Sequence, residues 1–196
     1  SRNSSFSVCV FSFSDKIIRR NTCLNNDDIY LTGTIGDSSI GLDLLKKKIR
    51  TNILKNNYFI NKYFKPNLPF GFHRELYKFA NSSMDVSDGL LIDLKKIVSA
   101  KKLGFTVNFN IIPKSKNFNN LKITKKKAIQ HLFNGDDYQI LFTAKKKYRK
   151  IILISAARWN QKVTRIGKIT RGKGDYLKID NKLNKIHNYQ GYIHCF

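Results

Sequence analysis

The sequence predicts an α/β or α+β domain in which helices pack on a mixed sheet. Short β-branched and aromatic segments alternate with segments whose apolar residues recur at helical spacing, and there is no internal repeat. The chain has 196 residues, 41% of them hydrophobic, which suffices for one well-cored domain or a domain with part of another. No apolar run approaches the roughly 20 residues of a transmembrane helix.

Strands are expected where apolar and polar residues alternate, or where β-branched and aromatic residues cluster between turn residues. The segments with this pattern are Phe6–Phe13, Asp28–Thr34, Met84–Val86, Gly104–Ile112, Tyr138–Thr143, Val163–Ile169 and Tyr176–Ile179. The chain opens without a Met into the first of these segments, and a strand at a terminus needs a partner. We therefore expect that the N-terminal part of a longer protein precedes Ser1.

Helices are expected where apolar residues recur at three- and four-residue spacing. The segments are 38–49, 90–100, 124–133 and 145–159, with a short helix within 71–81 and a helix or irregular connection over 52–63. Asp37 is the expected N-cap of the first helix, and Asn134-Gly135 the expected C-terminal stop of the helix over 124–133.

The chain is strongly basic, with 37 Lys and Arg against 13 Asp and Glu and a net charge of +24. This balance would suit a polyanionic partner such as nucleic acid. However, the lysine runs lie far apart in the sequence, and the abundant residues have codons rich in A and T. We therefore favour compositional drift over a dedicated nucleic-acid surface.

The three cysteines, Cys9, Cys23 and Cys195, form no CxxC pair and are odd in number. This pattern argues against a disulfide framework and a structural zinc site, and it fits a reducing cytoplasm. The four histidines show no paired ligand spacing.

The stretch SMDVSDGLLIDL, residues 83–94, gathers acid in this basic chain. Asp85, Ser87 and Asp88 would lie on a turn between a strand and a helix. Two carboxylates on such a turn can share a hard cation that bridges phosphate oxygens, and the N–H groups of a helix N-terminus favour phosphate. Alternatively, Ser87 or Asp88 caps the helix and Asp85 is solvated. The motif alone does not decide between the two.

Three other segments are weaker candidates. Asp136 and Asp137 in NGDDYQILFT follow a helix and precede a strand, where an ordinary turn is the simpler interpretation. The glycine turn in TGTIGDSSIGL, residues 32–42, could receive phosphate but lacks the Walker-A lysine spacing. The aromatic end HNYQGYIHCF could seal the core or face a ring-shaped ligand.

In order and spacing, DDIYLTGTIGDSSIGL, ANSSMDVSDGLLIDL, NGDDYQILFTA, VTRIGKIT and GYIHCF resemble the C-terminal part of the thiamine-monophosphate kinase family. That family belongs to the aminoimidazole-ribonucleotide-synthetase-like superfamily. The resemblance runs from about Phe6 to Phe196. It implies an ATP-dependent, magnesium-assisted, in-line transfer of a phosphoryl group to thiamine monophosphate, giving thiamine diphosphate.

The resemblance also implies a role for individual residues, although it identifies no catalytic residue. The implied set is Asp85 and Asp88 for Mg²⁺, Ser87 and Arg20 for ATP, and Asp136 and Tyr192 for the thiamine substrate. Asp136 stands where the family usually has the longer Glu, and Asn21-Thr22 stands where it usually has Ser-Gly. A guanidinium such as that of Arg20 can grip phosphate oxygens with two hydrogen bonds.

The family's N-terminal domain, with further magnesium-binding aspartates and the main dimer surface, is absent from this sequence. Residues 1–20 would then be the end of that domain and its linker, and 21–196 the C-terminal kinase domain. We expect half of an active site, inactive alone and homodimeric in the complete enzyme. The rivals are another ATP-using enzyme of the superfamily, selenophosphate synthetase-like or from a purine pathway, and a basic nucleic-acid-binding module.

Overall fold

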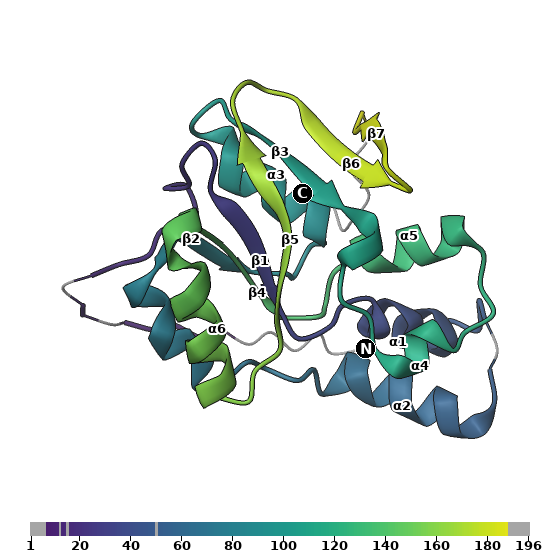
Figure 1. Ribbon diagram of the computed structural model, residues 1–196. Coiled ribbons are helices and arrows are strands. Elements are labelled where there is room, and N and C mark those ends of the chain that lie inside the picture. The colour runs from purple at the N-terminus through teal and green to yellow at the C-terminus, as the bar shows by residue number, and fades with distance from the viewer. Residues whose placement is uncertain (1–6, 12, 15, 50, 188–196) are drawn as a thin grey trace.

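The computed structural model describes residues 7–11, 13–14, 16–49 and 51–187. Its strands form one mixed sheet in the order β2-β4-β1-β5-β3-β6-β7, in which only the β3–β6 pair is parallel (Figure 1). The strands are β1 (Asp28–Thr32), β2 (Ala80–Asp85), β3 (Gly104–Asn108), β4 (Ile140–Ala144), β5 (Val163–Thr170), β6 (Asp175–Ile179) and β7 (Lys182–Lys185). The expected mixed sheet with packed helices is confirmed.

Helices connect these strands. The α-helices are α1 (Asp37–Leu45), α2 (Ile53–Phe64), α3 (Leu90–Ser99), α4 (Lys116–Asn119), α5 (Lys125–Phe133) and α6 (Arg149–Arg158), and the 3₁₀ helices are η1 (Phe72–Lys78), η2 (Phe109–Ile111) and η3 (Lys146–Tyr148). In the part of the chain that the structure describes, no helix has the length and apolarity to cross a membrane.

Two apolar layers cover the two faces of the sheet, because side chains along each strand alternate between them. Ile29 and Leu31 of β1 point into the larger layer, which also contains the buried residues of α3. Tyr30, between them, points into the smaller layer with Phe142, and their rings stack with centroids 5.1 Å apart. Figure 1 shows α6, which contributes to the smaller layer, on one face of the sheet and α3 on the other.

Several expected elements are wrong or incomplete. The described part of Phe6–Phe13 is exposed and pairs with no strand of the described sheet, so the alternation alone does not make it a strand. The first helix ends at Leu45 rather than Ile49, since Lys47 has a positive φ of 56° that stops helical propagation. The strand expected over 104–112 ends at Asn108, and β7 was not expected at all.

Two turns that are far apart in sequence interlock beyond the ends of β2 and β4. The Asp136 N–H donates to the Ser87 carbonyl, and the Tyr138 N–H donates to the Val86 carbonyl, each at 2.9 Å. A Cβ on Gly135 would lie 1.6 Å from the Ser87 carbonyl oxygen. Asn134, after α5, is extended, and Gly135 is not left-handed, so the expected glycine C-cap is wrong. Gly135 is needed there for the close approach of two backbones.

A Gly135→Ala substitution should lower the free energy of unfolding by about 2–4 kcal/mol, because a methyl group would push two backbone segments apart. Urea unfolding followed by circular dichroism measures this. Gly172→Ala is the matched control, since a Cβ there meets nothing within 4 Å and only the φ of +85° opposes it. Equal losses for the two variants would contradict the interlock.

Candidate functional site

The three motif turns lie together at one end of the strands, where β1 and β2 end and β4 begins, and this end is called the edge of the site below. Asp85 at the end of β2 pairs with Ile140 at the start of β4, and Thr32 at the end of β1 pairs with Val163 at the start of β5. Because β1 and β4 are neighbours, the segments 33–38, 85–89 and 134–139 all leave the sheet at this edge (Figure 1).

The buried carboxylate of Asp93 holds the turn between β2 and α3. Its Oδ2 accepts the N–H groups of Ser87, Asp88 and Gly89 at 3.2, 3.2 and 3.1 Å. Its Oδ1 accepts from Lys96 at 2.7 Å. Burial raises the pKa of Asp93, and the bonds from Lys96 oppose that shift. The N-cap of α3 is Gly89 rather than Ser87 or Asp88, and the side chain that holds the turn is Asp93 in the first turn of the helix.

A second buried carboxyl, that of Asp137, caps α1. Its two oxygens accept the N–H groups of Gly36 at 2.8 Å and Ser38 at 3.4 Å. Burial raises the pKa of Asp137 to about 8, although these two N–H groups act in the opposite direction. The glycine turn before α1 therefore directs two of its amides at an internal acid.

Asp37 is the first residue of α1 rather than its N-cap, which corrects the sequence-based expectation. Its buried carboxylate accepts hydrogen bonds from the Ser115 hydroxyl at 2.8 Å and the Tyr58 hydroxyl at 2.9 Å. Asp37 thus ties α1 to α2 and to the segment before α4.

The predicted acidic residues gather around the interlocked turns. Asp85 is exposed at the end of β2, and Asp88 is half-buried in an ion pair with Lys96. Burial raises the pKa of the Asp136 carboxyl, and the negative charge of Asp88 raises it further. Burial also raises the pKa of Tyr138, and the negative charges of Asp136 and Asp85 raise it further. The structure therefore brings these three aspartates into one electrostatic neighbourhood.

The carboxylate oxygens around these turns are the kind of ligand that Mg²⁺ prefers. Among the residues that the structure describes, no three His, Cys, Asp or Glu side chains converge as a ready-made metal site. Magnesium, however, is usually held by one or two carboxylates together with substrate phosphates and water. Asp85, at the end of β2, and Asp88, on the turn held by Asp93, would supply such carboxylates.

The other predicted residues are less closely grouped. Ser87 is half-buried on the same turn as Asp88. Arg20 is exposed on a turn, two residues before Thr22, whose hydroxyl donates to the Asn81 carbonyl near the start of β2. Through Thr22, the segment that carries Arg20 is held near the start of β2, whereas Asp85 lies at the end of that strand. Tyr192 lies outside the described residues.

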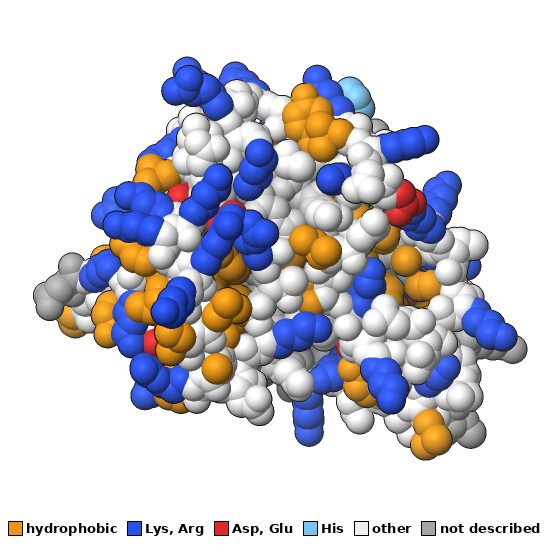
Figure 2. Space-filling model, in the orientation of Figure 1, with side chains coloured by type: hydrophobic (Ala, Val, Ile, Leu, Met, Phe, Trp, Pro, Cys, Tyr) orange, Lys and Arg blue, Asp and Glu red, His pale blue; other side chains and the backbone are white. Residues whose placement is uncertain are grey.

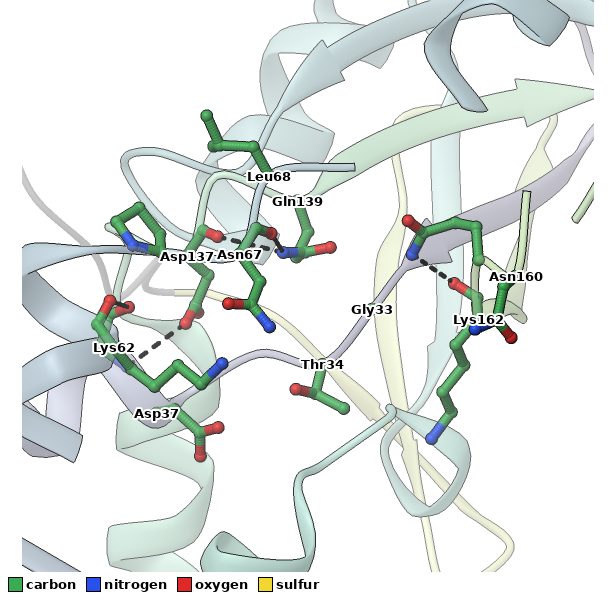
Figure 3. Close-up of a pocket in the computed structure, with 13 residues that line it drawn as sticks. Gly33, Thr34, Asp37, Lys62, Asn67, Leu68, Asp137, Gln139, Asn160 and Lys162 are labelled. Atoms are coloured by element: carbon green, nitrogen blue, oxygen red, sulfur yellow. Dashed lines mark hydrogen bonds between the residues drawn. The ribbon is translucent and has the colours of Figure 1, made fainter. Parts of the chain in front are cut away.

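A cavity of about 600 Å³ lies at the same edge, beside the interlocked turns (Figure 3). Its wall combines the buried acids Asp37 and Asp137 with Lys62 and Lys162. In the view of Figure 3, the two lysines lie on either side of Thr34. The remaining lining residues are Gly33, Ser38, Pro66, Asn67, Leu68, Gln139, Asn160 and Gln161.

Gln139 connects this cavity with the sheet edge, and no sequence pattern marked it as a functional residue. Its Oε1 accepts from the Thr32 hydroxyl at 3.0 Å, and its Nε2 donates to the Asn67 carbonyl at 2.6 Å. Its backbone carbonyl accepts the Val86 N–H at 2.9 Å. The roles of Asp93 and Asp137 were missed too, although an acid in the first turn of a helix, as at Asp93, is a recognisable capping signal.

The positive charge is distributed over much of the surface. Figure 2 shows Lys and Arg side chains over most of the visible face, interspersed with polar and apolar side chains. This distribution agrees with the separation of the lysine runs in the sequence.

Comparisons with known proteins agree with this fold. The family model for AIR synthase related protein, C-terminal domain, matches residues 26–180. A thiamine-monophosphate kinase from Buchnera aphidicola subsp. Schizaphis graminum is 37% identical over 180 residues, which cover 89% of this chain and 54% of the relative. The chain therefore spans about half the length of that relative.

Solved structures give the same result. The crystal structure of thiamine-monophosphate kinase from Stenotrophomonas maltophilia superposes with a TM-score of 0.74 and 28% identity, covering 85% of this chain and 54% of that one. A structure of AaThiL complexed with AMPPCP and TMP gives a TM-score of 0.71 at 24% identity, covering 90% and 54%. The chain belongs to the AIR synthase related protein, C-terminal domain family, and it resembles the C-terminal part of thiamine-monophosphate kinases.

Proposed function

We propose that this chain supplies one part of the active site of an enzyme that phosphorylates thiamine monophosphate with ATP, giving thiamine diphosphate. The observation that carries the proposal is the backbone hydrogen bonding that holds the turn bearing Asp136 against the segment bearing Asp85 and Asp88, in a chain that resembles thiamine-monophosphate kinases. The structural relative AaThiL was solved with AMPPCP and TMP, which supports ATP and thiamine monophosphate as the two substrates.

We propose that Asp85 and Asp88 hold Mg²⁺, which when bound would neutralise negative charge on the transferring phosphates. Asp88 would exchange its ion pair with Lys96 for this cation. Asp136 would orient the thiamine substrate at the same edge. Its carboxylate is one methylene shorter than that of Glu, so the substrate would have to approach the turn more closely.

The contacts of Ser87 and Arg20 with ATP, and of Tyr192 with the thiamine substrate, remain proposals that rest on the family resemblance. We also propose a homodimeric complete enzyme and a cytoplasmic location. Because the chain spans about half of its relatives, the other half would complete the site, so this chain alone should be inactive.

The first test is an assay for thiamine diphosphate. The chain alone, with ATP, Mg²⁺ and thiamine monophosphate, should make no product. The same chain joined to the N-terminal half of the Buchnera aphidicola relative should make it, because the missing phosphate-binding groups are restored. Product formation is measured by chromatography. A folded fusion that makes no product would contradict the kinase proposal, and product from the chain alone would contradict the half-site proposal.

The second test concerns the metal site. Asp85→Asn in the active fusion should reduce turnover by about two orders of magnitude or more, since a carboxylate that holds the cation loses its charge. Thermal unfolding should change little, because Asp85 is exposed. Asp43→Asn is the control, since Asp43 lies on α1 outside the three motif turns and forms a 4.0 Å ion pair with Lys48. Full activity of the Asp85 variant would exclude Asp85 as a ligand.

A further inference from the structure

The turn that leads into α3 is closed by an anion from within the chain. Three successive amides, those of Ser87, Asp88 and the N-cap Gly89, converge on the single atom Oδ2 of Asp93. Free amides at the start of a helix are a common phosphate site. The amides of residues 87–89, in contrast, already have an acceptor, and Asp93 is fully buried.

The second oxygen of Asp93 extends the same arrangement to a side chain. Oδ1 accepts from the Lys96 ammonium at 2.7 Å, and the same ammonium contacts Oδ2 of Asp88. One carboxylate therefore fixes the backbone of the turn and, through Lys96, the direction of Asp88. Lys96 keeps about a third of its side-chain surface exposed, so it can move away when another cation takes its place.

The turn before α1 follows the same plan with a different residue. Asp137 accepts two of the amides there, those of Gly36 and Ser38. Both strand-to-helix turns at this edge are thus closed by a buried aspartate. Asp93 follows its own turn closely in the sequence, whereas Asp137 comes from a distant part of the chain.

We infer that Asp93 is a positioning residue: it shapes the turn so that Asp85 and Asp88 face a divalent cation, and phosphate meets this turn through that cation rather than through the amides of residues 87–89. The cation part of this inference rests on the proposed function. The part concerning the turn rests on the hydrogen bonds alone, and the two parts can be tested separately.

The turn is tested by amide hydrogen exchange, followed by NMR on the 196-residue chain. In Asp93→Ala, the amides of residues 87–89 should exchange about ten- to a hundredfold faster, because each loses a hydrogen bond to a charged acceptor. Asp93→Asn should restore most of the protection, since its amide oxygen can still accept. Lys95→Ala is the control, because it removes a different ion pair of the same helix, the one with Asp175.

The cation is tested in the same samples with Mn²⁺, whose unpaired electrons broaden nearby NMR signals. Mn²⁺ should broaden the amide signals of residues 85–89 in the native chain and in Lys95→Ala, and at least about tenfold more Mn²⁺ should be needed in Asp93→Ala. ATP with a chelator should leave these signals in place, whereas ATP with Mg²⁺ should shift them.

Unchanged exchange at residues 87–89 in Asp93→Ala would overturn the positioning role. Faster exchange with unchanged Mn²⁺ broadening would show that the turn's shape is irrelevant to the cation, and would overturn the link between them. If metal-free ATP shifts the amides of 87–89, phosphate contacts them directly and the inference is wrong. If Mn²⁺ broadens none of these signals in the native chain, the cation part fails, while the exchange result still decides the role of Asp93.

Discussion

The carbonyl of Ser87 lies against the backbone of Gly135, and the arrangement of the whole site depends on that contact. It allows the Asp136 amide to reach the Ser87 carbonyl and continues the pairing of β2 and β4 past the ends of both strands. Without it, Asp88 and Asp136 would lie on independent loops, and nothing would hold their charges near each other. A Cβ at residue 135 would prevent this backbone contact, so the positions of the acidic side chains at this edge depend on a packing constraint.

The acidic residues of this basic chain serve two different purposes at the edge. Asp93 and Asp137 are buried and accept backbone amides, so they build the turns. Asp85, Asp88 and Asp136 are more exposed and present their charge outward. Three carboxylates held close to one another repel, and a bound cation would relieve this repulsion. The buried acids therefore support the position of the outer ones, and the outer ones are the groups that would attract a cation.

The sequence predicted the larger elements well, because helical spacing and strand alternation report directly on which face is buried. The helices over 90–100 and 124–133 and the strands at 28–34 and 163–169 all appear, with changes at their ends. The alternation at Phe6–Phe13 was not a sufficient signal, since a strand also needs hydrogen-bond partners and the described part of this segment pairs with no strand. Gly135 lies in the expected turn after the helix over 124–133, but it does not adopt a left-handed conformation. A side chain is excluded there because the Ser87 carbonyl lies too close.

The sequence by itself determined which residue types could bind a cation, and it placed Asp85 and Asp88 on the turn between a strand and a helix. That much follows from local pattern, since a glycine and two carboxylates before an apolar helical period are visible in a single stretch of chain. The bonds from the amides of residues 87–89 to Asp93 are local as well, since Asp93 lies in the first turn of the following helix. Only the tertiary structure decided that the Asp136 turn lies against this one. The reason is physical: residues 87 and 136 are far apart in the sequence, and they meet because β2 and β4 pair in the sheet.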